Sequence, residues 1–305
     1  MSKIVVVTVA THEEGYIDSL RDGLYPTPLL VVGLGERWDN YTTKTKLLHN
    51  YLMQEGVKLP QDTIFVVCDA YDVLYNKRYQ IADLQQEFLA RNVDIMFSSF
   101  NFANEMGYVK YYANNILRPI SFDSNFILSC NTGLYMGYRR ALLPVLEKML
   151  SVYDYDDERR LNTVLRECEP FKLLDTMLTC NFKTADNVLF KFGIDTTNSL
   201  FLTHFPASTG LEFYRLIFFG DYSPPLNIME KSRAFFVHFI GNQNLDQICR
   251  KEGLYHNELT KMRKYTIAHK WAHYARYFYF EIGVVIAIVI LVIWWNIKMY
   301  KRNRK

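Results

Sequence analysis

Two carboxylates stand at the end of an apolar run in the stretch TIFVVCDAYDVLYNK, at positions 63–77. Asp69 breaks the run, and Asp72 follows three residues later. If the run is a strand whose end bends into a loop, both side chains come close together. Paired carboxylates with one imidazole suit Mg²⁺ or Mn²⁺, and such an ion neutralises charge on a departing diphosphate. The alternative is that Asp69 only caps a turn and Asp72 is solvated.

Apolar runs alternate with helical patterns over the first part of the chain. Strands are predicted at 4–11, 28–35 and 63–75, and helices at 12–25 and 43–56. Continuous apolar strands that alternate with helices predict a mainly parallel sheet covered on both faces. Ligands of such folds bind at the carboxyl ends of the strands, which is where we expect Asp69 to lie.

The later part of the chain gives weaker signals. A helix is predicted at 81–92 and a strand at 93–102, followed by a strand, an Asn-Thr-Gly turn and a helix over 124–153. An acidic run, DYDDE at 154–158, precedes a further helix, and a strand pair is expected around Asp175. A short strand at 233–244 presents His238. No repeat or linker is found, so one globular domain is predicted over 1–250.

The composition excludes one class of partner. Lys and Arg total 35 against 32 Asp and Glu, which gives a formal net charge of +3. No overall field therefore marks a nucleic-acid-binding protein. The five cysteines lack metal-binding spacing, and we expect scattered, mostly buried thiols.

The last thirty residues are typical of a membrane anchor. The apolar span 277–297 is long enough to cross a hydrocarbon layer, with tyrosines at one edge and tryptophans at the other. We therefore expect a basic juxtamembrane segment at 251–276, a single transmembrane helix at 277–297 and a basic tail at 298–305. Basic residues are balanced on the two sides, so the side of the membrane that holds the domain is open, and a tail-anchored arrangement is the simpler one. The alternative is a buried C-terminal helix.

Two rival sites can be weighed against a metal site. The stretch VVGLGERW has only part of a dinucleotide-binding pattern, because Trp38 stands where the third glycine would be, and no phosphate-binding Gly-Lys-Ser/Thr loop occurs. A phosphatase that uses an aspartyl nucleophile would need its second Asp two residues after the first, where this chain has Tyr71. Both rivals are weaker than the metal site.

Several stretches taken together, in order along the chain, resemble a known family. They are VVVTVATHEEGY, VVGLGERWDNYTTKTKLL, IFVVCDAYDVLY, SCNTGLYMGY, YDYDDE and FFVHFIGN, which lie between about residues 3 and 245. The chain is similar in them to the glycosyltransferase domain of the multifunctional collagen lysyl hydroxylases and to the related procollagen galactosyltransferases. The resemblance implies a GT-A fold, a UDP-sugar donor and dependence on Mn²⁺, with Mg²⁺ as the alternative ion.

The resemblance also implies roles for individual residues. Asp69, Asp72 and His238 would hold the metal. Donor contacts would come from eight residues: Thr8, Thr11, Trp38, Lys44, Tyr71, Asn131, Gly241 and Asn242. Asp156, Asp157 and Asp175 would position the acceptor or the donor sugar, and they are the candidates for a catalytic carboxylate. The chain departs from the family after His238, where Phe239 and Ile240 precede the Gly-Asn pair.

The combined expectation is an α/β protein of GT-A type, with a mixed, mainly parallel sheet flanked by helices and one C-terminal transmembrane helix. We expect a metal-dependent hexosyltransferase that moves a hexose from a UDP-hexose donor to an unknown hydroxyl acceptor, which could be protein-linked, and no nucleic-acid partner. One alternative is a catalytically degenerate, membrane-anchored interaction module that keeps the transferase fold. A metal-dependent phosphohydrolase is the other.

Overall fold

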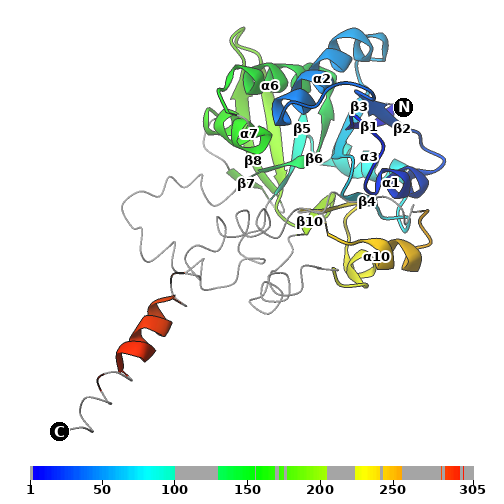
Figure 1. Cartoon of the computed structure of the whole chain (residues 1–305). Coiled ribbons are helices and arrows are strands. Elements are labelled where there is room, and N and C mark those ends of the chain that lie inside the picture. Colours follow the sequence, from blue (N-terminus) through cyan, green and yellow to red (C-terminus); the bar gives the residue numbers. More distant parts are fainter. Residues whose placement is uncertain are drawn as a thin grey trace.

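The computed structural model describes residues 3–99, 130–154, 156–168, 172–174, 177–204, 224–240, 243–255 and 286–295, together with 283 and 298. Three predicted site residues, Asp175, Gly241 and Asn242, lie outside these ranges. Figure 1 shows a central sheet with helices packed on both faces, as the alternation of apolar strands and helices predicted.

The main sheet has eight strands in the order β2-β1-β3-β6-β5-β9-β8-β7. Their bounds are β1 Ile4–Val9, β2 Leu29–Val32, β3 Ile64–Asp69, β5 Ile95–Ser99, β6 Cys130–Tyr138, β7 Lys172–Leu174, β8 Met177–Lys183 and β9 Leu189–Asp195. The pairs β1–β2, β1–β3 and β5–β9 are parallel, whereas β6 runs antiparallel to both of its neighbours, and β8 to both of its own. The sheet is therefore mixed, and its parallel part is concentrated in the first three strands.

A second, three-stranded sheet has the order β10-β11-β4, with β4 Val73–Tyr75, β10 Phe201–His204 and β11 Phe236–Phe239. Strand β4 follows β3 after a link of only three residues, 70–72. One continuous segment of chain therefore ends a strand of the first sheet and begins a strand of the second. The single strand predicted over 63–75 is two strands, and the link between them holds Asp72.

Helices cover the two faces of the main sheet. They are α1 Ile17–Leu24, α2 Tyr41–Gln54, η1 Gly56–Lys58, α3 Ile81–Ala90, α6 Arg139–Ser151 and α7 Asp157–Arg166. Two shorter helices, α9 Ile228–Lys231 and α10 Asp246–Lys251, pack against the second sheet instead. One core cluster joins the sheet to α2, α6 and α7 through side chains such as Phe65, Leu48 and Leu146. A second cluster, on the opposite face, joins it to α1 and α3 through Val66, Leu20 and Phe88.

The turn predicted at Asn-Thr-Gly is wrong. Asn131, Thr132 and Gly133 lie inside β6 and are buried. The register between β5 and β6 shifts between Phe97 and Ser98, at the same level. Glycine at this position serves a close side-chain approach, described below, and not a change of chain direction.

The predicted transmembrane helix at 277–297 is also wrong. Within the described part of the chain, no helix is long and apolar enough to cross a membrane. The single-pass, membrane-anchored localisation that rested on this helix falls with it.

Asp195, at the end of β9, stabilises the connection into β10. Its buried carboxylate accepts hydrogen bonds from the backbone N–H groups of Ser199, Leu200 and Phe201, at 3.2, 2.6 and 3.0 Å. These bonds satisfy buried donors that have left the main sheet and have not yet paired in the second one. Asp195 therefore anchors the entry into β10.

Asp195→Ala is expected to lower the free energy of unfolding by about 3 kcal/mol, because it leaves buried N–H groups without an acceptor. Urea denaturation followed by circular dichroism measures the change. Asp186→Ala, at an exposed position between β8 and β9, is the matched control and should shift the midpoint very little. Equal effects of the two substitutions would contradict this role for Asp195.

Candidate metal centre

Three potential metal ligands meet where the two sheets join. Asp69 ends β3, Asp72 lies in the link to β4, and His238 lies in β11, which pairs antiparallel with β4 and places His238 opposite Val73. One ligand atom from each residue lies within 4.8 Å of the others. His238 Nε2 is 3.5 Å from Asp69 Oδ2 and 3.3 Å from Asp72 Oδ1. Two hard oxygen ligands and one imidazole fit Mg²⁺ or Mn²⁺, so the residues that sequence analysis grouped as ligands lie together in space.

Asn131 determines which nitrogen of His238 faces the carboxylates with a lone pair. Asn131 Oδ1 accepts a hydrogen bond from the Gly133 N–H at 2.7 Å and lies 2.9 Å from His238 Nδ1. Because an amide oxygen only accepts, Nδ1 must carry the proton in this contact. In the neutral ring, Nε2 then presents its lone pair to Asp69 and Asp72, which is the orientation that a metal ligand needs.

The same geometry affects the protonation of His238. Burial alone would lower the pKa of the imidazole, but the neighbouring carboxylates, Asp72 foremost and then Asp69, outweigh burial and raise that pKa. The carboxylates thus favour a positive charge at Nε2. A divalent cation at this place would provide that charge instead of the proton.

Gly133 gives the His238 ring the room that it occupies. A Cβ atom at position 133 would lie 2.2 Å from His238 Cε1 and 2.7 Å from Asn131 Oδ1. Any side chain there would have to displace the imidazole or the amide that orients it. This close approach explains the glycine, and only the folded structure reveals it.

The ammonium group of Lys44 links the carboxylates of Asp69 and Asp157. This group is buried and lies 2.5 Å from Asp69 Oδ1, 3.0 Å from Asp157 Oδ2 and 3.1 Å from the carbonyl oxygen of Thr132. Burial would lower the pKa of this amine, but Asp157 and Asp69 hold it well above its usual value. All three N–H donors of the ammonium group therefore have acceptors within the protein. The donor contact expected of Lys44 stays a prediction.

The acidic run at 154–158 divides into distinct roles. Asp156 is the N-cap of α7, where its carboxylate accepts from the N–H groups of Glu158 and Arg159 at 3.0 and 3.4 Å. Asp157 is occupied by the ion pair with Lys44. Burial, followed by the charges of Asp156 and Asp157, raises the pKa of Glu158 well above its usual value. Sequence analysis missed Glu158; its place beside Asp157 in the first turn of the helix was the available signal.

The residues expected to contact the nucleotide differ in their accessibility. Thr8 is fully buried, and its hydroxyl donates to the carbonyl oxygen of Cys68 at 2.8 Å, so it links β1 to β3. Thr11 Oγ1 lies 2.9 Å from His12 Nδ1, and the Tyr71 hydroxyl donates to the carbonyl oxygen of His12 at 3.0 Å. Trp38 is 39% exposed and lies edge-on to another ring. Tyr71 and Trp38 are thus the accessible members of this group near the carboxyl end of β1, whereas Thr11 is buried.

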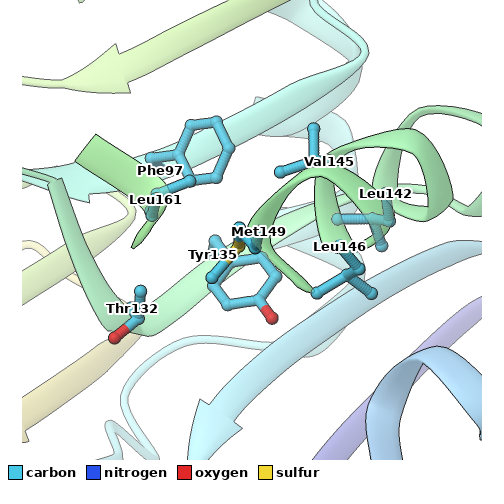
Figure 2. A pocket seen from close by; sticks show the side chains of 8 residues that line it. All are labelled: Phe97, Thr132, Tyr135, Leu142, Val145, Leu146, Met149 and Leu161. Carbon is cyan, nitrogen blue, oxygen red and sulfur yellow. The ribbon is translucent and has the colours of Figure 1, made fainter. Parts of the chain in front are cut away.

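A small pocket behind β6 belongs to the core. Figure 2 shows it surrounded by apolar side chains from α6, with Phe97 of β5, Leu161 of α7 and the ring of Tyr135. Seven of its eight lining residues belong to the core cluster on that face of the sheet: Phe97, Tyr135, Leu142, Val145, Leu146, Met149 and Leu161. We assign it no role in ligand binding.

Gly133→Ala is expected to weaken Mn²⁺ binding at least tenfold, because the added methyl group displaces the ring of His238. Isothermal titration calorimetry on the metal-free protein measures the affinity. Gly23→Ala in α1, where the added Cβ has no neighbour nearer than 3.4 Å, is the control and should bind Mn²⁺ as the wild type does. Unchanged Mn²⁺ affinity in Gly133→Ala would contradict the proposed seat of His238.

Glu158→Gln is expected to flatten the pH dependence of stability. Because its pKa is raised in the folded state, Glu158 keeps a proton that the unfolded chain loses above about pH 4.5. The free energy of unfolding therefore falls as pH rises above that value, by up to about 1.4 kcal/mol per pH unit for one proton.

Glu158→Gln removes this contribution, so its stability relative to the wild type should increase between pH 5 and 7 in chelator-treated protein. Urea denaturation at several pH values measures it. Glu87→Gln, at an exposed position of α3, should run parallel to the wild type. If the stability of Glu158→Gln also changes with pH in parallel with that of the wild type, Glu158 does not hold this proton.

Solved structures offer only distant similarity. A glycosyltransferase involved in the glycosylation of the major capsid of PBCV-1 is 11% identical, with a TM-score of 0.41, over 77% of this chain and 93% of that one. A197 from STIV is 11% identical, with a TM-score of 0.34, over 62% and 93%. The 4-diphosphocytidyl-2C-methyl-D-erythritol synthase from Anaerococcus prevotii DSM 20548 is 10% identical, with a TM-score of 0.32, over 53% and 82%. These similarities are too low to support an argument.

Sequence comparison is more informative. No curated protein sequence matches the chain significantly. The family model of the PLOD GT domain, however, matches residues 1–164, which include Asp69, Asp72, Lys44, Asn131 and Asp157. This match covers more than half of the 305 residues and confirms the resemblance found in the sequence. The chain therefore belongs to the PLOD GT domain family, a family of glycosyltransferase domains.

Proposed function

We propose that the protein transfers a hexose from a UDP-sugar to a hydroxyl acceptor with the help of Mn²⁺ or Mg²⁺. The observation that carries the proposal is the group of Asp69, Asp72 and His238, whose ligand atoms lie within 4.8 Å of one another in a chain of the PLOD GT domain family. A divalent cation held there would stabilise negative charge on the departing diphosphate.

Contacts within the protein hold the side chains of this centre in position. Lys44 holds Asp69 and Asp157 in place, and Asn131 turns the lone pair of His238 Nε2 toward Asp69 and Asp72. The Phe239 N–H donates to the carbonyl oxygen of Asp72 at 2.7 Å, which fixes the link that carries this carboxylate. Because these side chains are already held in position, they lose little conformational entropy when the ion and the nucleotide bind.

Nucleotide contacts are proposed at the neighbouring strand ends. Tyr71 and Trp38 are the accessible candidates for the uridine side of the donor, and Thr11 is a buried one. Gly241 and Asn242 follow β11 and are proposed for the diphosphate side. Thr8 supports this region from within the sheet through its bond to Cys68.

The acceptor hydroxyl needs a group that takes its proton. Of the predicted carboxylates, Asp156 caps α7 and Asp157 is paired with Lys44, and Asp175 stays a candidate. Glu158 joins them because burial and the charges of Asp156 and Asp157 raise its pKa, which makes its carboxylate a stronger base. We propose Glu158 and Asp175 as the groups to test first as proton acceptors.

The structure bears on the departure from the family after His238. Phe239 is the last residue of β11 and is fully buried against Leu74, Val237 and Leu245. Its side chain thus packs away from the metal ligands and leaves His238 in place. This placement favours an active enzyme over an interaction module that keeps only the fold.

The test measures UDP binding to the full chain by calorimetry with Mn²⁺, and hydrolysis of UDP-glucose and UDP-galactose. We expect Asp69→Asn combined with Asp72→Asn to lower both at least a hundredfold, because the ion loses two of its three protein ligands. Asp186→Asn on the exposed β8–β9 connection is the control and should leave both unchanged.

Absence of both UDP binding and sugar-nucleotide hydrolysis in the folded wild-type protein would overturn the proposal and favour an interaction module. Metal-dependent cleavage of simple phosphate esters without any use of sugar nucleotides would instead indicate a phosphohydrolase.

A further inference from the structure

Thr203 of β10 carries a buried hydroxyl group that has no hydrogen-bond partner within the described part of the chain. The residue is 2% exposed, and its Oγ1 atom is fully enclosed. Leaving such a group unpaired costs on the order of 1–3 kcal/mol, and most buried polar atoms in proteins are paired. An orphaned hydroxyl therefore needs an explanation, and a ligand is one source of a partner.

The register of the second sheet places Thr203 beside His238. Strands β10 and β11 are parallel, and Thr203 is the direct partner of His238. Neighbouring strands lie about 4.8 Å apart, and paired residues point to the same face of a sheet. The flanking residues show which face this is. Phe201 and Phe236 pack into the core under the main sheet, whereas Leu202 and Val237 pack toward α10.

Thr203 therefore shares the inner face with His238, the face on which His238 Nε2 approaches Asp69 and Asp72. The imidazole has Asn131 on its other nitrogen, and Lys44 has three acceptors. Of Thr203, His238 and Lys44, only Thr203 has a donor without an acceptor in the described part of the chain.

The chemistry around this hydroxyl favours an anionic oxygen as its partner. No basic residue occurs from Phe239 to Cys249, the segment that follows His238. Within this segment only neutral groups can donate hydrogen bonds to an anion at the candidate metal centre. A hydroxyl donates well to a phosphate oxygen, and a bond to a charged acceptor is stronger than one between neutral groups.

We propose that Thr203 donates a hydrogen bond to the diphosphate group of the bound nucleotide and is a binding residue of the donor site. This inference rests on the proposed function, because it needs a nucleotide diphosphate beside the metal ligands. In the nucleotide complex, this bond gives the unpaired hydroxyl of Thr203 a hydrogen-bond acceptor.

The experiment compares Thr203→Val with the wild-type full chain, using UDP and uridine as probes in the presence of Mn²⁺. Valine has nearly the shape of threonine but cannot donate. We expect UDP affinity, measured by calorimetry, to fall about tenfold, the loss of one hydrogen bond to a charged group, while the affinity for uridine, which has no phosphate, changes less than twofold. Thr203→Ser keeps the hydroxyl and should keep UDP affinity within threefold of the wild type.

Thr63→Val is a matched control. Thr63 is also buried with an unpartnered Oγ1 atom, but it precedes β3 and so lies at the opposite end of that strand from Asp69. The Thr63→Val variant should bind UDP with the affinity of the wild type. Because each valine replaces an unpaired buried hydroxyl, both variants should melt without nucleotide at or above the wild-type temperature, which shows that Thr203→Val folds.

Three results would overturn the inference. If Thr203→Val binds UDP as tightly as the wild type, the hydroxyl does not contact the nucleotide and the proposed function still stands. If UDP and uridine affinities fall equally, Thr203 acts on the fold of the site and not on the diphosphate. If the wild type binds no UDP, the proposed function and this inference both fail.

Discussion

The buried ammonium group of Lys44 is the interaction on which the arrangement of the acidic groups depends. Asp69 comes from the end of β3 and Asp157 from the first turn of α7, yet both lie within 3.0 Å of Lys44 Nζ. Two carboxylates that approach each other in a partly buried place repel strongly, and removal from water adds to the cost. Lys44 offsets both effects. Since α2 provides this lysine, the helix that follows β2 fixes the distance between the metal ligands and the acidic run.

The candidate metal centre also depends on the register of two sheets. Asp69 belongs to the main sheet, and His238 belongs to the second one. A slip of one residue in β11 would turn His238 toward α10 and bring Val237 or Phe239 into its place. Packing resists such a slip, because the apolar side chains on each face of β11 fill different core clusters. Gly133 adds a steric constraint, since the His238 ring fits against β6 only where no Cβ is present. The position of one imidazole is therefore set by the packing of three strands.

Much of the local structure could be predicted from the sequence, because apolar runs and helical spacing are local properties. The segments β1 to α2 follow the predicted order, and the placement of Asp69 at a strand end followed from it. Contacts between distant segments were harder to predict from the sequence. The sequence Asn-Thr-Gly has turn composition, but its glycine is explained by His238, which lies 105 residues further along the chain. The hydroxyl of Thr8 donates to the carbonyl oxygen of Cys68, sixty residues further along the chain, a bond that the sequence does not reveal, and its nucleotide contact stays a prediction. For the C-terminal segment, hydropathy alone indicated a membrane span, and within the described residues no helix is long and apolar enough for one.

The formal charges at the junction explain why metal and nucleotide binding should be coupled. Asp69, Asp72 and Asp157 contribute three negative charges, and Lys44 contributes one positive charge, so with neutral His238 two negative charges are left over. A diphosphate brought to this place without a cation meets repulsion that partly buried surroundings screen poorly. A divalent ion held by Asp69, Asp72 and His238 balances the two charges and adds a direct attraction for phosphate oxygens. In free-energy terms, the ion lowers the cost of placing the nucleotide there, and by linkage the nucleotide raises the affinity for the ion by the same factor. Protonation of His238 supplies only one positive charge and adds no coordination, so it replaces the ion incompletely.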